Sequence, residues 1–143
     1  MRAALVALVV LPWLAGCPAP TKGPSASEIH MQKENEITSL WTQIRQFRHE
    51  AGMDLDPSPT LISEPPKSVS DAKRVCPDGH KVPQTCNDIC SLADAICDNA
   101  EAICGLADEL GKQDDFAQGK CTSAKASCRE AKQRCCGCSD KVP

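Results

Sequence analysis

Apolar side chains recur at helical spacing in the first half of the chain, up to Gly52. They lie three or four positions apart, at Ile37, Leu40, Trp41, Ile44, Phe47 and Ala51. This spacing places side chains on one face of a helix. Ser25 and Glu28 match a capping box, the pattern of a helix start. We therefore predict an amphipathic helix over residues 28–52, which packs only from Ile37 onward because its first turns are polar.

Cysteines repeat every seven residues in two later stretches of the chain. The two triplets are Cys90, Cys97 and Cys104, and then Cys121, Cys128 and Cys135. A period of seven keeps side chains on one helix face with slight drift. Residues 111–115 have the composition of a helix-to-helix turn, and Asp115 with Gln118 is a candidate cap for the helix that follows. The pattern predicts an antiparallel helical hairpin.

Facing residues in an antiparallel helix pair have position numbers with a constant sum. Three cysteine pairs share one sum, and they are Cys90–Cys135, Cys97–Cys128 and Cys104–Cys121. Three alanine pairs share a sum that is lower by one, and they are Ala93–Ala131, Ala100–Ala124 and Ala107–Ala117. Small alanine layers between the cysteine layers let two backbones approach to the Cα separation of about 5.5 Å that a disulfide needs. We expect a ladder of disulfides between the two helices.

Four further cysteines, Cys76, Cys86, Cys136 and Cys138, have three possible pairings. Cys86 and Cys138 share the sum of the alanine layers, so the favoured pairs are Cys86–Cys138 and Cys76–Cys136. Gly137 can end the second helix and redirect Cys138. The rival pairs are then Cys76–Cys138 and Cys86–Cys136.

The first cysteine helix also carries an apolar stripe beside its cysteines. The stripe consists of Ile89, Leu92, Ile96, Ile103, Leu106 and Leu110. The helix predicted at 28–52 would cover this stripe if it docked on the hairpin. The predicted fold is then all-α, a small three-helix bundle built on a disulfide-laddered hairpin at 76–143. The alternative is that the stripe stays exposed and binds a partner or a second copy. Residues 53–75 are rich in Pro and Ser and are predicted to form an extended connector.

Composition favours an exported protein without electrostatic affinity for nucleic acid. Ten of the 11 cysteines fall between Cys76 and Cys138, while Tyr is absent and Phe and Trp number two each. Such density in a small chain is typical of disulfides in an oxidising compartment. The net charge of −3 argues against nucleic acid or anionic lipid as an electrostatic partner. An acidic stretch at 86–110 faces a basic one at 116–136, which favours the predicted helix pairing.

The N-terminus has the organisation of an export signal. Arg2 precedes an uncharged run that is too short to span a bilayer. The run ends in Leu14, Ala15, Gly16 and Cys17, which resembles the lipobox of bacterial lipoproteins. The resemblance implies a signal peptide at 1–16, a diacylglyceryl group on the thiol of Cys17, and a fatty acyl chain such as palmitate on its amino group. An ordinary cleaved signal is the alternative.

The lipobox resemblance also bears on location. Residues 17–27 would then be the lipidated cysteine and its tether. Pro18 stands where inner-membrane lipoproteins often carry Asp, which favours the outer membrane over the inner membrane. The cysteine spacing further resembles that of cysteine-rich lipoproteins of myxobacterial type, a similarity that implies no activity.

Two cysteine clusters have spacings that are found in redox-active or zinc-binding sites. Cys135 and Cys138 form a C-x-x-C motif, a spacing found in redox-active disulfides, although no thioredoxin-like strand pattern surrounds it. A second cluster offers the ligand types of a zinc site, at Cys76, His80, Cys86 and Cys90. Disulfide formation is a simpler explanation for the same cysteines. His30 and His49 lie on a predicted helix with no nearby catalytic nucleophile and are interpreted as solvated. We predict no catalytic residue, metal or cofactor.

The sequence therefore favours a non-enzymatic cell-envelope lipoprotein held on a membrane by N-terminal acyl chains. It would act as a disulfide-stabilised structural or protein-interaction module, with an unidentified envelope protein as a partner and no small-molecule substrate. The alternative is a metal-binding or thiol-redox lipoprotein that uses the cysteine cluster.

Overall fold

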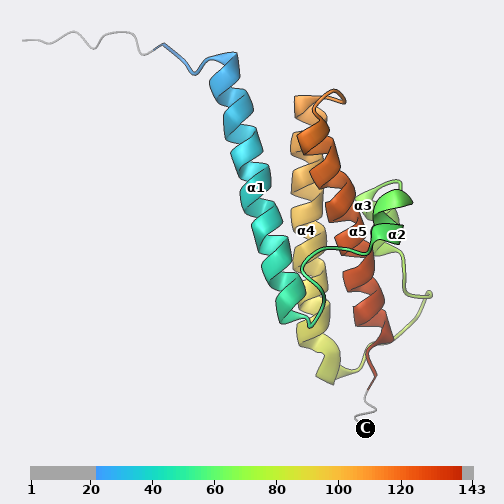
Figure 1. Ribbon diagram of the computed structural model, residues 1–143. Coiled ribbons are helices and arrows are strands. Elements are labelled where there is room, and N and C mark those ends of the chain that lie inside the picture. Colours follow the sequence, from blue (N-terminus) through green and yellow to red (C-terminus); the bar gives the residue numbers. More distant parts are fainter. Residues whose placement is uncertain (1–21, 140–143) are drawn as a thin grey trace, which may run out of the picture.

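The structure, a computed structural model, describes residues 22–139, and this part of the chain is all-helical with no strand. The predicted signal peptide and the predicted lipidation site, Cys17, lie outside the described residues. Helices α4 (Asn87–Leu110) and α5 (Asp115–Gly137) form an antiparallel pair, preceded by a 3₁₀ turn at Gln84–Cys86. Helix α1 (Ala26–Glu50) runs alongside α4, and the short helices α2 (Pro59–Ser63) and α3 (Val69–Lys73) lie against α5 (Figure 1).

Helix α1 begins at the predicted capping box, which is confirmed. The Ser25 backbone N–H donates to Glu28 Oε2 at 2.6 Å, and the Glu28 N–H donates to Ser25 Oγ at 3.3 Å. The hydrogen bond from Ser25 lowers the pKa of the Glu28 carboxyl. The helix ends at Glu50 with Ala51 as its C-cap, and Gly52 follows with a φ of +70°, a conformation that favours glycine.

The cap predicted for the second hairpin helix is wrong by one residue. Asp114, not Asp115, is the N-cap of α5, and its Oδ1 accepts the Ala117 N–H at 2.9 Å. Gln118 reaches back to α4, and its Nε2 donates to the Ala107 carbonyl at 2.9 Å. Because Gln118 bonds to the preceding helix, it does not complete a capping box on α5.

The segment 53–75, predicted to be extended, contains two short helices. Ser68 caps α3 by accepting the Asp71 N–H at 3.0 Å, and Pro59 occupies the first turn of α2. Proline is well suited to a first helical turn, so the Pro content that indicated an extended chain is compatible with α2. Val69 and Ala72 of α3 are buried in the core, so this segment covers part of the hairpin.

The core lies along the contacts of α1, α4 and α5. Ile37 and Ile44 of α1 are fully buried in one cluster with Ile96 and Ile103 of α4, and Trp41 is 8% exposed. Lys120 of α5 lies over the Trp41 ring at 5.0 Å, a cation–π contact between α5 and α1. Apolar burial on α1 thus starts at Ile37, as predicted.

Candidate functional site

The ladder of disulfides is the dominant feature of the described chain. Its five pairs, with Cα–Cα distances, are Cys104–Cys121 (4.7 Å), Cys97–Cys128 (4.7 Å), Cys90–Cys135 (4.8 Å), Cys86–Cys138 (6.1 Å) and Cys76–Cys136 (5.5 Å). These are the pairs that the sequence favours, including the two that close the open end of the hairpin. The rival pairing of those two is not present.

Alanine layers explain how the two helices come so close. All six alanines of the layers are at most 1% exposed, namely Ala93, Ala100, Ala107, Ala117, Ala124 and Ala131. Their small methyl groups leave room for the Cα–Cα distances of 4.7–4.8 Å at the three bridges between α4 and α5. Cys97 and Cys128 are themselves fully buried, so their bridge, the middle one of the three between α4 and α5, is inaccessible to solvent.

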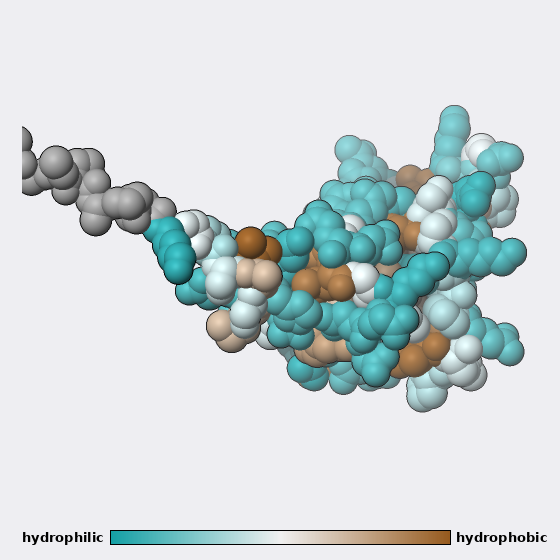
Figure 2. Space-filling view, turned by 90° about the horizontal axis from the view of Figure 1, so that it is seen from above, coloured by the Kyte–Doolittle hydropathy of each residue, from teal (hydrophilic) through white to brown (hydrophobic). Residues whose placement is uncertain are grey.

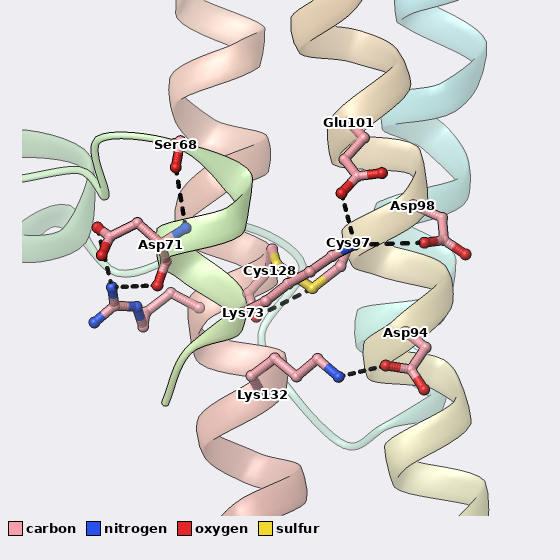
Figure 3. Close-up of a disulfide and its surroundings, with 10 residues drawn as sticks. Ser68, Asp71, Lys73, Asp94, Cys97, Asp98, Glu101, Cys128 and Lys132 are labelled. Atoms are coloured by element: carbon pink, nitrogen blue, oxygen red, sulfur yellow. Dashed lines mark hydrogen bonds and ion pairs between the residues drawn. A yellow bond between two sulfur atoms is a disulfide. The ribbon is translucent and has the colours of Figure 1, made fainter. Parts of the chain in front are cut away.

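Charged side chains surround the Cys97–Cys128 disulfide (Figure 3). Lys132 of α5 pairs with Asp94 of α4, the one ion pair that joins these two helices directly within residues 22–139. Lys73 of α3 bonds to Glu101 at 2.6 Å and lies 3.8 Å from Asp98. The hydrogen bond to Glu101 raises the pKa of Lys73 against the opposing effect of burial.

The acidic face of α4 is therefore shared among several partners. Lys33 of α1 pairs with Glu109 at 2.8 Å, in addition to the contacts of Lys73 and Lys132. On α5, Arg129 donates to the Asp71 carbonyl of α3 at 2.9 Å. Because alanine and cysteine fill the facing surfaces of α4 and α5, most of the charged side chains of these two helices that form ion pairs meet α1 or α3 at the flanks, and Lys132 with Asp94 is the exception.

The apolar stripe of α4 is not a free surface. Ile96 and Ile103 are fully buried, and the other four members, Ile89, Leu92, Leu106 and Leu110, are partly buried. Large hydrophobic side chains that are exposed lie elsewhere, at Ile29, Met31, Leu55, Ile62 and Phe116. On the face shown in Figure 2, hydrophobic surface forms small separate patches in a mostly hydrophilic surround.

The two cysteine clusters that suggested chemistry are divided among different disulfides. Cys135 and Cys138 of the C-x-x-C motif bond to Cys90 and Cys86, not to each other. Cys76, Cys86 and Cys90 likewise have three different partners on or after α5. His80 and His49 are exposed, and among the described residues no cysteine retains a thiol for these motifs.

Sequence reasoning missed a buried ion pair between Arg48 of α1 and Glu130 of α5. Arg48 is 2% exposed, and its Nη2 lies 2.7 Å from Glu130 Oε2. The same guanidinium donates to the carbonyls of Asp54 at 2.7 Å and Asp56 at 3.0 Å. Arg48 follows Ile37, Trp41 and Ile44 at helical spacing, a signal that places it on the buried face.

The environment of Glu130 favours its charged form. Burial acts to raise the pKa of Glu130, but hydrogen bonds from Ser58 and Arg48 outweigh it and hold that pKa below its usual value. The Ser58 N–H donates to Glu130 Oε1 at 2.8 Å. Both oxygens of this carboxylate therefore hold other segments, α1 and the start of α2, against α5. The pair lines an open groove of about 520 Å³.

No protein-family model, curated protein or solved structure matches the chain. In the described part of the chain, each helix is too short or too polar to cross a membrane.

Proposed function

We propose that the chain is a lipid-anchored, non-enzymatic lipoprotein of the cell envelope that acts as a disulfide-stabilised structural or protein-interaction module. The observation that carries this proposal is the ladder, in which ten cysteines form five disulfides. Disulfides persist in oxidising compartments and are rare in the cytosol. A chain stapled in this way needs export, and the lipobox ending at Cys17 would supply both export and an anchor.

The architecture that we favour for this module is a small three-helix bundle of α1, α4 and α5. Burial of Ile37 and Ile44 against Ile96 and Ile103 supports it, because α1 then covers the stripe beside the cysteine seam. A domain with so few aromatic side chains has a limited apolar core, and the disulfides compensate by restricting the unfolded chain. Resistance to unfolding and proteolysis outside the cytoplasm is the property that such a module would provide.

The anchor would lie at one defined end of the bundle. The described chain enters α1 beside the turn between α4 and α5, whereas the last residues of α5 lie at the opposite end (Figure 1). Acyl chains on Cys17 would therefore hold the α4–α5 turn near the membrane. The Cys86–Cys138 and Cys76–Cys136 bridges would point away from it, and Pro18 favours the outer membrane as the site.

Substitution of Cys17 tests the anchor. We expect Cys17→Ser to abolish acylation and cleavage, which leaves the uncleaved precursor in whole-cell extracts. Pro18→Ala is the matched control and should be processed and partition into detergent like the wild type. Normal processing of Cys17→Ser, together with continued partition into detergent, would contradict the proposal.

A further inference from the structure

Three potential metal ligands meet where the first turns of α1 lie beside the turn between α4 and α5. His30 and Glu34 are one helical turn apart on α1, and Asp114 is the N-cap of α5. His30 Nε2 lies 3.6 Å from Glu34 Oε1 and 3.2 Å from Asp114 Oδ2. One ligand atom from each side chain can be chosen so that all three lie within 4.8 Å of one another.

We propose that His30, Glu34 and Asp114 bind a divalent transition-metal ion, with Zn²⁺ as the best fit. Metal–ligand bonds of about 2.0–2.2 Å place neighbouring ligand atoms of a tetrahedral Zn²⁺ site about 3.3–3.6 Å apart. The distances from His30 Nε2 to the two carboxylates lie close to that range. An imidazole nitrogen favours Zn²⁺ and similar ions over Ca²⁺ and Mg²⁺, which prefer oxygen ligands alone.

The local charge supports a divalent ion. Glu34 and Asp114 bring two carboxylates to one imidazole, and the nearest lysine along α1, Lys33, is paired with Glu109. With a neutral histidine, the cluster has two negative charges that a divalent ion would neutralise. The three side chains also differ in exposure, from 49% for His30 to 8% for Asp114, so the ion would be held against the protein with its outer side open to water.

Asp114 is already oriented for this role. Its Oδ1 accepts the Ala117 N–H, which fixes the carboxylate and leaves Oδ2 facing His30. A ligand whose second oxygen is held by a hydrogen bond loses less conformational freedom on binding a metal. Asp114 would thus use Oδ1 for capping and Oδ2 for the metal. A substitution can therefore remove the metal ligand and keep the cap.

A metal at this position would clip the start of α1 to the hairpin. Between Ala26 and Glu36 no side chain of α1 is buried, and Ile29 and Met31 are exposed. The cross-links between this part of α1 and the hairpin are polar, namely His30 with Asp114 and Lys33 with Glu109. The ion would therefore stabilise the part of α1 that apolar packing leaves free, without using any cysteine.

Calorimetric titration of Zn²⁺ into the tag-free full chain tests the proposal, with the disulfides formed and Cys17 alkylated. We expect one saturable site, which His30→Ala weakens roughly tenfold or more, given that loss of even a supporting side chain costs about 10–100-fold in affinity. Asp114→Asn should weaken it comparably, because the amide oxygen can still cap Ala117 but coordinates Zn²⁺ poorly. His49→Ala and His80→Ala are matched controls on exposed histidines and should leave the affinity unchanged.

Hydrogen exchange provides an independent readout. Zn²⁺ should slow exchange of backbone amides at residues 26–36 in the wild type and not in His30→Ala. The absence of saturable binding, or equal affinity in the wild type, His30→Ala and Asp114→Asn, would overturn the proposal. Loss of binding in His49→Ala or His80→Ala would place the metal elsewhere and would overturn it as well.

Discussion

Arg48 Nη2 and Glu130 Oε2, 2.7 Å apart, join the last turn of α1 to the C-terminal half of α5. Arg48 is 2% exposed, so its guanidinium is removed from water and depends on protein partners for hydrogen bonds. Two of those partners are the carbonyls of Asp54 and Asp56, just after α1. The pair therefore fixes the end of α1, the loop that follows it and α5 in one arrangement.

Removal of the Glu130 carboxylate should destabilise the fold. We expect Glu130→Ala to lower the free energy of unfolding by about 2–3 kcal/mol, because Arg48 then stays buried without its counter-charge. The side chain of Glu130 keeps 19% exposure, so the loss should fall below that of a fully buried pair. Denaturant unfolding under oxidising conditions measures the change. Glu36→Ala, on the exposed face of α1, is the control and should stay within about 0.5 kcal/mol of the wild type.

Glu130 also makes the stability depend on acid pH. Its pKa in the folded protein lies below the value of 4.5 for the free side chain, so its charged form favours folding. The stabilisation is complete above about pH 4.5 and is lost as the pH falls through the folded pKa. We expect the difference in Tm between the wild type and Glu130→Gln to shrink as the pH falls below 4.5. A difference that stays constant with pH would show that the ionisation of Glu130 does not contribute.

The alanine layers should tolerate no larger side chain. Ala100 is fully buried between the cysteine layers, so Ala100→Leu should force α4 and α5 apart. We expect a loss of about 1–3 kcal/mol from overpacking, with free thiols at the neighbouring bridges where the separation exceeds disulfide reach. Ala102→Leu makes the same change on the exposed face of α4 and should leave stability and thiol content unchanged. Thiol titration and unfolding curves of the two variants measure both effects. Equal stability and equal thiol content in Ala100→Leu and Ala102→Leu would contradict this prediction.

The five bridges should differ in the order in which they are reduced. Cys97 and Cys128 are both fully buried, whereas Cys76 and Cys136 are both partly exposed. Since exchange requires access of a thiolate to sulfur, we expect a graded series of dithiothreitol to reduce Cys76–Cys136 early and Cys97–Cys128 last. Alkylation and peptide mapping at each step measure the order. Early modification of Cys97 would contradict the burial of the middle bridge.

The hairpin could be predicted from the sequence because a helix has a fixed period. Seven-residue spacing determines which side chains share a face, and the constant sum of positions then selects Cys97 with Cys128 as facing residues. Burial of Ile96 and Ile103 follows from the same periodicity. In these cases the spacing of residues along each helix is enough to predict which side chains meet in the folded protein.

Other contacts depend on loops whose path the sequence does not reveal. Val69 and Ala72 are buried because α3 packs on the hairpin, although a segment rich in Pro and Ser gave no apolar period. Arg48 has the right spacing for the buried face, but its burial requires the carbonyls of the loop after α1. The contact of His30 with Asp114 likewise depends on how the start of α1 lies beside the α4–α5 turn.

The intact mass of the protein purified from its native membranes tests the central claim most directly. The account predicts a chain that begins at Cys17, carries a diacylglyceryl group and an acyl chain, and lacks the ten hydrogens lost in five disulfides. Iodoacetamide should add no mass before reduction and should modify ten cysteines after it. An unacylated chain that retains residues 1–16, or a chain in which more than one cysteine reacts with iodoacetamide before reduction, would contradict the account.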